Sequence, residues 1–183
     1  MIKQKKVGSI LNKFIPQGST IGIIGGGQLG QMMALDAKQT GMKVIILDPT
    51  PNCPAGQVAD EQIVAPYADT KAIEKLADKA DVLTYEFENV DLDALEDVQD
   101  RVYLPQGTNL LSTTKNRLRE KNFLRQAGVK TAPFMAVHTS AELKDAVKKI
   151  GYPAVLKTSE GGYDGHGQEV LRNKDDLDKC API

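Results

Sequence analysis

TIGIIGGGQLG, residues 20–30, is the stretch that decides the fold. Its first half is a short β-branched run bounded by glycine, which is typical of a strand buried on both faces of a parallel sheet. Its second half satisfies the pattern G-x-G-x-x-G, whose glycines allow a tight turn and let a ligand approach the backbone. A helix that begins there presents free N–H groups that attract an anion such as a phosphate. A turn that binds nothing remains the alternative.

The residues after the glycines continue a β-α-β unit. A helix is predicted by apolar residues at helical spacing, namely Leu29, Met32, Met33 and Ala37. Gly41 is a plausible helix stop, and residues 42–48 (MKVIILD) form a second buried strand. Asp48 then ends this strand where a dinucleotide-binding domain places the acidic residue that contacts ribose. The prolines that follow, Pro49, Pro51 and Pro54, indicate a rigid excursion at that position and disfavour NAD.

The alternation of helix and strand continues as far as Pro105. Helices are predicted over residues 73–80 and 92–98, and strands over residues 82–85 and 102–104. Strands separated by helices predict a parallel sheet with right-handed crossovers. We therefore expect an α/β fold, a Rossmann-like doubly wound parallel sheet over residues 19–105, preceded by a leader over residues 1–18.

Beyond Pro105 the pattern changes. A basic helix is predicted over residues 113–127, ended by Gly128, and a second helix starts at a capping box formed by Thr139 and Glu142. Strands are then predicted over residues 152–157 and 168–172. The glycine-rich connection between them is longer than an ordinary hairpin loop, which indicates a function.

Composition bounds the ligands. The chain has 183 residues, and its 23 Lys+Arg against 24 Asp+Glu give a net charge of -1. That balance argues against a non-specific nucleic-acid or membrane-surface binder, so small-molecule ligands are expected. The basic helix is then most simply a solvated face. No apolar run is long enough for a membrane span or a signal peptide, and Cys53 and Cys180 form no disulfide framework, which favours a reduced, cytoplasmic location.

Two groups of residues suggest chemistry besides the first glycine loop. Glu86 and Glu88 flank Phe87 at a predicted strand end, so their carboxylates share a face at the carboxyl edge of the sheet and could hold an amine or ribose hydroxyls. A solvated strand end is the alternative. Lys157 ends a strand just before the loop GGYDGHGQ (residues 161–168), an arrangement that can neutralise ATP without a Walker loop. A flexible hairpin with a surface lysine is the alternative, and the two histidines are too isolated to predict a metal site.

Together these motifs resemble the N-terminal half of the N5-carboxyaminoimidazole ribonucleotide synthetases, the ATPase subunits of a carboxylation step in purine biosynthesis. The resemblance runs from about Thr20 to about Leu177. The motifs that carry it are IIGGGQLGQM (23–32), LDP (47–49), YEFENV (85–90), PQG (105–107), Lys115–Arg119, Lys157 and GGYDGHGQ (161–168).

The resemblance implies a pre-ATP-grasp domain followed, over residues 106–183, by a linker helix and the first, incomplete part of an ATP-grasp α+β domain. It implies a ligase that uses ATP to activate bicarbonate as carboxyphosphate and carboxylates 5-aminoimidazole ribonucleotide. The ATP contacts it implies are Arg117, Lys157, Gly162, Tyr163, Asp164, Gly165, His166, Gly167 and Gln168. The substrate contacts it implies are Gly27, Gln28, Leu29, Glu86 and Glu88, and Tyr163 and Asp164 are the candidate catalytic residues.

The resemblance also implies Mg²⁺, a homodimer, and metal ligands in a second half that these 183 residues do not include. A chain without those ligands is expected to show little or no ligase activity alone, because Mg²⁺ carries much of the charge neutralisation in phosphoryl transfer. Two alternatives stay open: an NAD-binding oxidoreductase domain, and a non-catalytic fragment that keeps a nucleotide or sugar-phosphate site.

Overall fold

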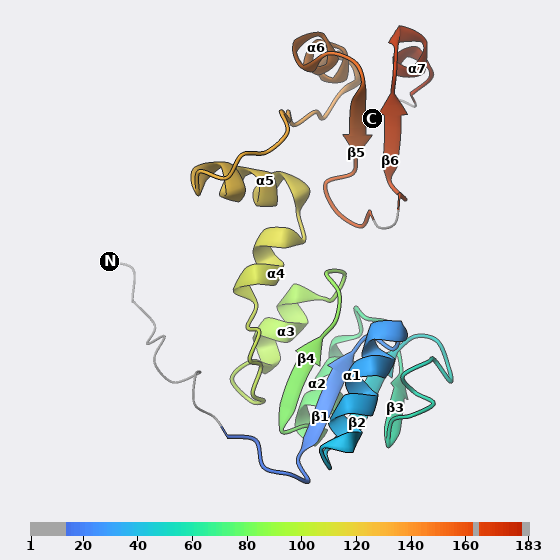
Figure 1. Cartoon of the computed structure of the whole chain (residues 1–183), viewed down its shortest axis with the longest axis vertical. Helices are drawn as coiled ribbons and strands as arrows, with labels where there is room; N and C mark the ends of the chain where they lie inside the picture. The colour runs from blue at the N-terminus through green and yellow to red at the C-terminus, as the bar shows by residue number, and fades with distance from the viewer. Residues whose placement is uncertain (1–13, 163–164, 181–183) are drawn as a thin grey trace. The chain divides into compact units, whose positions relative to one another are not determined.

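The computed structural model describes residues 14–162 and 165–180. It divides into two compact units, which meet between Leu111 and Ser112 in the chain. Figure 1 shows the elements of both, and each unit is described by itself. No helix in the described part of the chain has the length and apolar character that crossing a membrane requires.

The first unit is built on a four-stranded sheet in which every pairing is parallel. Its strands are β1 (Thr20–Ile24), β2 (Lys43–Asp48), β3 (Glu61–Val64) and β4 (Val82–Tyr85), in the order β3-β2-β1-β4. Because β1 lies in the middle, the chain leaves it first towards β2 and later returns to β4 on its other side. The Rossmann-like doubly wound parallel sheet predicted from the sequence is confirmed.

Helices cover both faces of this sheet (Figure 1). Strand side chains alternate between the faces, so neighbouring residues of one strand enter different hydrophobic clusters. On one face α1 (Gln28–Gln39) packs through Ala34 against Ile23 and Ile46. On the other face lie α2 (Thr70–Lys79) and α3 (Leu92–Val98).

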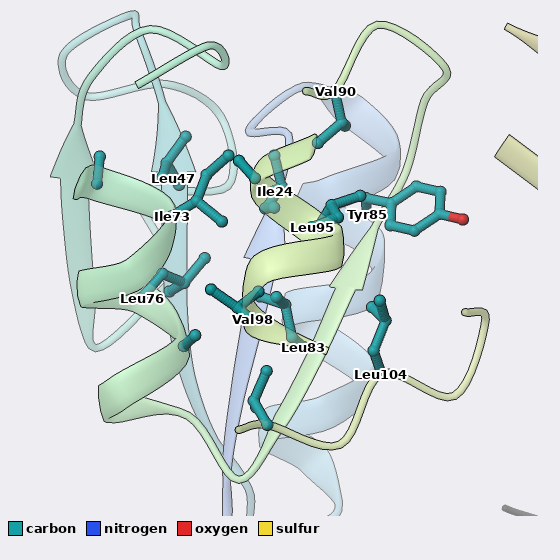
Figure 2. Close-up of a cluster of buried hydrophobic side chains, with 14 of the residues drawn as sticks. Ile24, Leu47, Ile73, Leu76, Leu83, Tyr85, Val90, Leu95, Val98 and Leu104 are labelled. Atoms are coloured by element: carbon teal, nitrogen blue, oxygen red, sulfur yellow. The ribbon is translucent and has the colours of Figure 1, made fainter. Parts of the chain in front are cut away.

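The α2 and α3 side holds the larger cluster, shown in Figure 2. Its side chains with 0% exposure come from three strands and two helices, apart from Val90: Ile24, Leu47, Leu83, Ile73, Leu76, Leu95 and Val98. Full burial of such a side chain contributes about 1.5–3 kcal/mol, so this face supplies most of the unit's hydrophobic stabilisation. On the opposite face the strands contribute large residues such as Ile23 and Ile46, and the segments that cover them contribute small ones such as Ala34 and Ala55.

The predicted helix after the glycines is confirmed, but the side chains that face the sheet differ from the expectation. Leu29 and Met32 are each 58% exposed, whereas Gly30 and Ala34 are buried. A Cβ on Gly30 would lie 3.2 Å from the carbonyl carbon of Gly25, so the helix sits too close to the loop for a larger residue. The other two residues predicted for this stripe, Met33 and Ala37, are partly buried and pack against the cluster beside Ala34.

The two edges of the sheet were predicted least well. Strand β3 was not predicted, because Ile63 is its one buried residue and no apolar alternation marks it. The strand predicted over residues 102–104 is an isolated bridge between Tyr103 and Val82. The Gln106 side chain replaces the missing ladder, because its Oε1 accepts from the backbone N–H of Tyr85 (3.2 Å) and its Nε2 donates to the Tyr85 carbonyl (3.1 Å).

Helix α4 (Asn109–Thr114) runs across the boundary between the units, and α5 (Arg117–Gln126) follows it. The basic helix predicted over residues 113–127 is therefore confirmed over Arg117–Gln126, but its first two residues belong to the separate helix α4. The break has a local cause, because the Asn116 side chain accepts hydrogen bonds from the backbone N–H groups of Leu118 (3.1 Å) and Arg119 (3.0 Å) and so starts a new helix.

The rest of the second unit is an antiparallel hairpin with helices on one face. The strands β5 (Ala154–Lys157) and β6 (Gln168–Leu171) pair as predicted, with ends one or two residues shorter. Helix α6 (Ser140–Ile150) starts at the predicted capping box, where the Thr139 side chain accepts from the Glu142 N–H (3.2 Å). A last helix, α7 (Lys174–Lys179), was not predicted. The buried core of this unit consists of Leu143, Val147, Leu171 and Leu177.

Candidate functional site

The first candidate site lies at the carboxyl edge of the parallel sheet, where the glycine loop (residues 25–27) joins β1 to α1. The loop and the end of β4 are tied to the neighbouring strand ends. The Gly25 N–H donates to the Leu47 carbonyl (3.0 Å), and the Glu86 N–H donates to the Ile24 carbonyl (3.2 Å). Ligands of open α/β sheets bind at this edge. Four of the predicted substrate residues therefore lie at one edge of the sheet, namely Gly27, Gln28, Leu29 and Glu86.

The start of α1 is open to an anion. Its N-cap residue Gly27 supplies no side-chain hydrogen bond, and the first turn contains no acidic residue. Gln28 and Leu29, the first two helical residues, are both exposed. The first N–H groups of a helix have no intrahelical acceptor and carry a partial positive charge, so this end can bind a phosphate group.

Asp48 takes a structural role at this edge. Its carboxylate is buried, with 5% of the residue exposed, and accepts three hydrogen bonds. Oδ2 accepts from the Gly26 N–H (2.8 Å) and from the Tyr67 hydroxyl, and Oδ1 accepts from the Thr50 N–H (2.8 Å). These three protein donors use most of the acceptor sites of the Asp48 carboxylate, which disfavours the contact to ribose that a dinucleotide-binding domain makes at this position.

Two of the three loop glycines have no room for a side chain. A Cβ on Gly25, whose φ is +113°, would lie 2.7 Å from Glu86 Oε1. A Cβ on Gly26 would collide with Cys53 Sγ and lie 2.8 Å from the Cβ of Asp48. Gly27 has space, because its nearest neighbour would be Glu86 Oε1 at 3.6 Å. The loop is therefore tightly packed at Gly25 and Gly26 and has free space at Gly27, where α1 begins.

Glu86 and Glu88 differ in their surroundings. The predicted strand that would have aligned them ends at Tyr85, and both lie in the bend and turn that follow. Glu86 is half-buried, and burial, with a smaller contribution from the charge of Asp48, raises the pKa of its carboxyl group. Among the residues that the structure describes, none donates a hydrogen bond to that carboxylate. Glu88 is exposed, so Glu86 alone faces the glycine loop.

The second candidate site is the hairpin loop of the second unit. Lys157 ends β5 opposite Gln168 of β6, and both are exposed. The loop closes at its base, where the Thr158 N–H donates to the Gly167 carbonyl (2.8 Å). Left-handed backbone at Gly165 (φ +86°) and Gly167 (φ +69°) explains why glycines stand there.

Helix α5 brings Arg117 to this loop from a distant part of the sequence. The Arg117 N–H donates to the Ser159 carbonyl (2.8 Å), and its Nη2 lies 3.5 Å from the Gly162 carbonyl. Asn116 strengthens the junction through its Nδ2, which donates to Glu160 Oε1 (2.9 Å). A cationic side chain held at the base of a glycine-rich loop suits a ligand that carries phosphate groups.

The predicted ATP residues are therefore brought together in part. The second unit places Arg117, Gly162 and Gly167 around one loop base, with Lys157 at the adjoining strand end. His166 is exposed and has an interaction partner. The candidate catalytic residues, Tyr163 and Asp164, lie outside the described residues. Over the described ranges, no three His, Cys, Asp or Glu side chains gather in a way that could hold a metal ion.

Two residues at the first site were missed by reasoning from the sequence. Tyr67 donates to Asp48 and its ring packs edge-on against Phe87, with the ring centroids 4.5 Å apart. Gln106 completes the edge of β4. Tyr67 follows β3, and because that strand was not predicted, the place of Tyr67 at the carboxyl edge could not be predicted either. Gln106 lies in the PQG motif, which contributed to the family resemblance but had no physical explanation in the sequence.

The fold and these two loops define the class of protein. Residues 18–113 match the ribonucleotide synthetase preATP-grasp domain, and residues 122–183 match the ATP-grasp domain. Since the first match covers more than half of the 183 residues, the chain belongs to the family with a ribonucleotide synthetase preATP-grasp domain.

Within this family the chain is similar to N5-carboxyaminoimidazole ribonucleotide synthases. It is 52% identical over 171 residues to the synthase of Bacillus subtilis (strain 168), a match that covers 93% of this chain and 45% of the relative. The N5-carboxyaminoimidazole synthetase of Staphylococcus aureus complexed with ADP superposes with a TM-score of 0.89 at 44% identity, covering 93% of this chain and 46% of that one.

A fungal structure shows the same likeness at lower identity. The N5-carboxyaminoimidazole synthase of Aspergillus clavatus, in complex with ADP and 5-aminoimidazole ribonucleotide, superposes with a TM-score of 0.76 at 30% identity. That match covers 89% of this chain and 43% of the fungal chain. The chain thus spans less than half the length of these relatives.

Proposed function

We propose that this chain contributes the ribonucleotide site and part of the ATP site to an ATP-dependent carbon-nitrogen ligase of purine biosynthesis. The reaction is the carboxylation of 5-aminoimidazole ribonucleotide with bicarbonate to N5-carboxyaminoimidazole ribonucleotide, with ADP and phosphate as the other products. The proposal is supported by the relatives, one of which was solved with ADP and 5-aminoimidazole ribonucleotide.

The observation that carries the proposal is the pairing of two features at one sheet edge. The uncapped start of α1 suits an anion, and the Glu86 carboxylate, which packs on Gly25, suits a hydroxyl or amine donor. A ribonucleotide that bears a phosphate and an amine offers both groups. In this proposal the phosphate accepts hydrogen bonds from the backbone N–H groups at the start of α1, from Gln28 onward. A hydroxyl or amine of the ligand donates to the Glu86 carboxylate.

The second unit supplies cations and a glycine loop for ATP. Arg117 and Lys157 neutralise phosphate charge, and the loop of residues 162–168 closes over the bound nucleotide. Carboxyphosphate is short-lived in water, so a closing loop would both exclude solvent and orient the activated carboxyl group for attack by the amine. Tyr163 and Asp164 are proposed to face the reacting groups from that loop.

Mg²⁺ belongs to the proposal as the partner of ATP, with ligands outside the described residues. When bound, it neutralises charge on the transferred phosphoryl group. A homodimer is likewise proposed from the resemblance, and a cytoplasmic location from the cysteine content. Sedimentation equilibrium of the purified chain tests whether these residues carry the dimer interface: a dimer at micromolar concentration supports this, and a monomer contradicts it.

Calorimetric titration of the purified chain tests the two sites separately. We expect saturable binding of 5-aminoimidazole ribonucleotide that weakens in Glu86→Gln and persists in the exposed control Glu88→Gln. We expect ATP binding that weakens in Lys157→Met and persists in Lys148→Met, a control on the exposed surface of α6. Binding of NADH with the same affinity as the ribonucleotide would contradict the proposal. Ribonucleotide binding that stays at the wild-type level in both glutamate variants would also contradict it.

A further inference from the structure

A closed circuit of contacts crosses the carboxyl edge of the sheet, and Tyr67 joins its two arms. We propose that Tyr67 is a positioning residue that fixes the glycine loop and Glu86 relative to each other. The ligand it prepares the edge for, 5-aminoimidazole ribonucleotide, rests on the proposed function. Neither the sequence motifs nor the proposed substrate contacts include Tyr67.

The first arm runs from Tyr67 through Asp48 to the glycine loop. The Tyr67 hydroxyl and the Gly26 N–H donate to the same oxygen of Asp48, and the Thr50 N–H donates to the other oxygen. Because Asp48 is buried, its carboxylate keeps this geometry only while its donors remain. The shared oxygen turns the Gly26 N–H inward, so the anion-binding N–H groups are those of the following residues, at the start of α1.

The second arm runs from Tyr67 through Phe87 to Glu86. The two aromatic rings meet edge to face, with an interplanar angle of 63°. Such a pair is worth about 0.5–1.5 kcal/mol beyond the area it buries, enough to hold the bend after β4 in one position. Phe87 is bonded directly to Glu86, whose side chain packs on Gly25, and this last contact closes the circuit.

The circuit also sets the charge at the edge. Asp48 and Glu86 are both acidic, and burial, followed by the charge of Asp48, raises the pKa of Glu86. The Tyr67 hydroxyl offsets part of that charge by donating to Asp48. Burial and this hydrogen bond raise the pKa of the phenol above its ordinary value, so Tyr67 stays protonated and remains a donor at neutral pH.

Two substitutions separate the arms, and a third serves as the control. Tyr67→Phe removes the hydroxyl and keeps the ring, whereas Phe87→Leu removes the ring contact and keeps the hydroxyl. Tyr85→Phe is the matched control, because the Tyr85 hydroxyl donates to the Gly107 carbonyl (2.9 Å) in the same unit but takes no part in the circuit. It should cost comparable stability while leaving the contacts among Tyr67, Asp48, Phe87 and Glu86 in place.

The first measurement uses the ligand-free chain and follows the Glu86 carboxyl carbon by NMR as the pH is varied. We expect the midpoint of Glu86 to rise in Tyr67→Phe, because the charge of Asp48 loses its hydroxyl donor, and to stay unchanged in Tyr85→Phe. An unchanged midpoint in Tyr67→Phe, with a loss of stability equal to that in Tyr85→Phe, would reduce Tyr67 to an ordinary structural residue and overturn the inference.

The second measurement is the affinity for 5-aminoimidazole ribonucleotide by calorimetry. We expect a loss of about five- to tenfold in Tyr67→Phe and in Phe87→Leu, and none in Tyr85→Phe, which corresponds to the net value of one hydrogen bond or one aromatic pair. Wild-type affinity in Tyr67→Phe would contradict the inference. Failure of the wild-type chain to bind would instead contradict the proposed function, and the titration of Glu86 would still decide the role of Tyr67.

Discussion

Replacing Gly26 by alanine tests the packing of the glycine loop most sharply. The new Cβ would collide with Cys53 Sγ and lie 2.8 and 2.9 Å from Cβ and Cγ of Asp48. Cys53 is 2% exposed and Asp48 5% exposed, so neither side chain can move into solvent. One of them, or the loop itself, must shift within a packed interior.

The cost follows from these contacts. Overpacking a core position costs about 1–3 kcal/mol. Strain on the hydrogen bond from Gly26 to the ionised Asp48 adds to it, whereas the reduced freedom of the unfolded chain offsets about 0.4–1 kcal/mol. We expect Gly26→Ala to lower the free energy of unfolding of the first unit by about 1–3 kcal/mol. Gly27→Ala, whose Cβ has 3.6 Å of space, should change it by less than about 1 kcal/mol.

Hydrogen exchange of the buried amides in β2 measures this free energy for the first unit alone. Gly26→Ala should speed their exchange, and adding Cys53→Ala should recover part of the loss, because Sγ is the nearest obstacle. Equal exchange rates in Gly26→Ala and Gly27→Ala would refute the reasoning. An effect of Cys53→Ala that is merely additive would refute the assignment of the clash to the thiol.

Three further substitutions test the core, a helix cap and the half-buried carboxyl group of Glu86. Leu76→Ala, at a side chain with 0% exposure, should cost about 2–5 kcal/mol by urea unfolding, and Leu110→Ala, at 68% exposure, less than about 0.5 kcal/mol. Thr139→Ala should cost the second unit about 1 kcal/mol, seen as faster amide exchange in α6, through the loss of its N-cap. Because the pKa of Glu86 is raised by folding, the folded state binds its proton more tightly, and the stability of the first unit falls as pH rises from the unfolded pKa through the folded one. Glu86→Gln should remove that fall and raise stability at pH 8, whereas Glu88→Gln should leave the pH profile of hydrogen exchange as in the wild-type chain.

The central strands and their helices could be predicted because their residues repeat a local pattern. The run from Thr20 to Ile24 is β-branched apart from Gly22 and carries no charge, as expected for a strand covered on both faces, and the structure buries its last three residues. The capping box at Thr139 predicted a helix start from two side chains that act within one turn. Periodicity and capping are local, so one sequence is enough to find them.

The sheet edges and the face of α1 could not be predicted, because they depend on distant residues. Gln106 acts as a substitute strand residue only because the chain returns alongside β4. Leu29 and Met32 matched the helical period, but the closeness of Gly30 to Gly25 decided which face packs. Asn116 interrupts a basic stretch that periodicity alone reads as one helix.

At the candidate sites the motifs located the loops, and the structure assigned the tasks. The glycine pattern and Asp48 were found together from the sequence. One of the three groups that donate hydrogen bonds to the Asp48 carboxylate is the Tyr67 hydroxyl, and no sequence motif includes Tyr67. Arg117 and the second glycine loop are far apart in the sequence, and their contact is a property of the folded unit. The sequence therefore predicts which segments form the candidate sites, but not which of their polar atoms already have hydrogen-bond partners within the protein.

The most direct test of the account is an NMR titration of the isotope-labelled chain, first with 5-aminoimidazole ribonucleotide and then with ATP. The account predicts that the ribonucleotide shifts the amide signals of Gly27, Gln28 and Glu86, and that ATP shifts those of Lys157 and Gly167. Ribonucleotide shifts that are absent from the glycine loop, or the same loop shifts produced by NADH in their place, would contradict it.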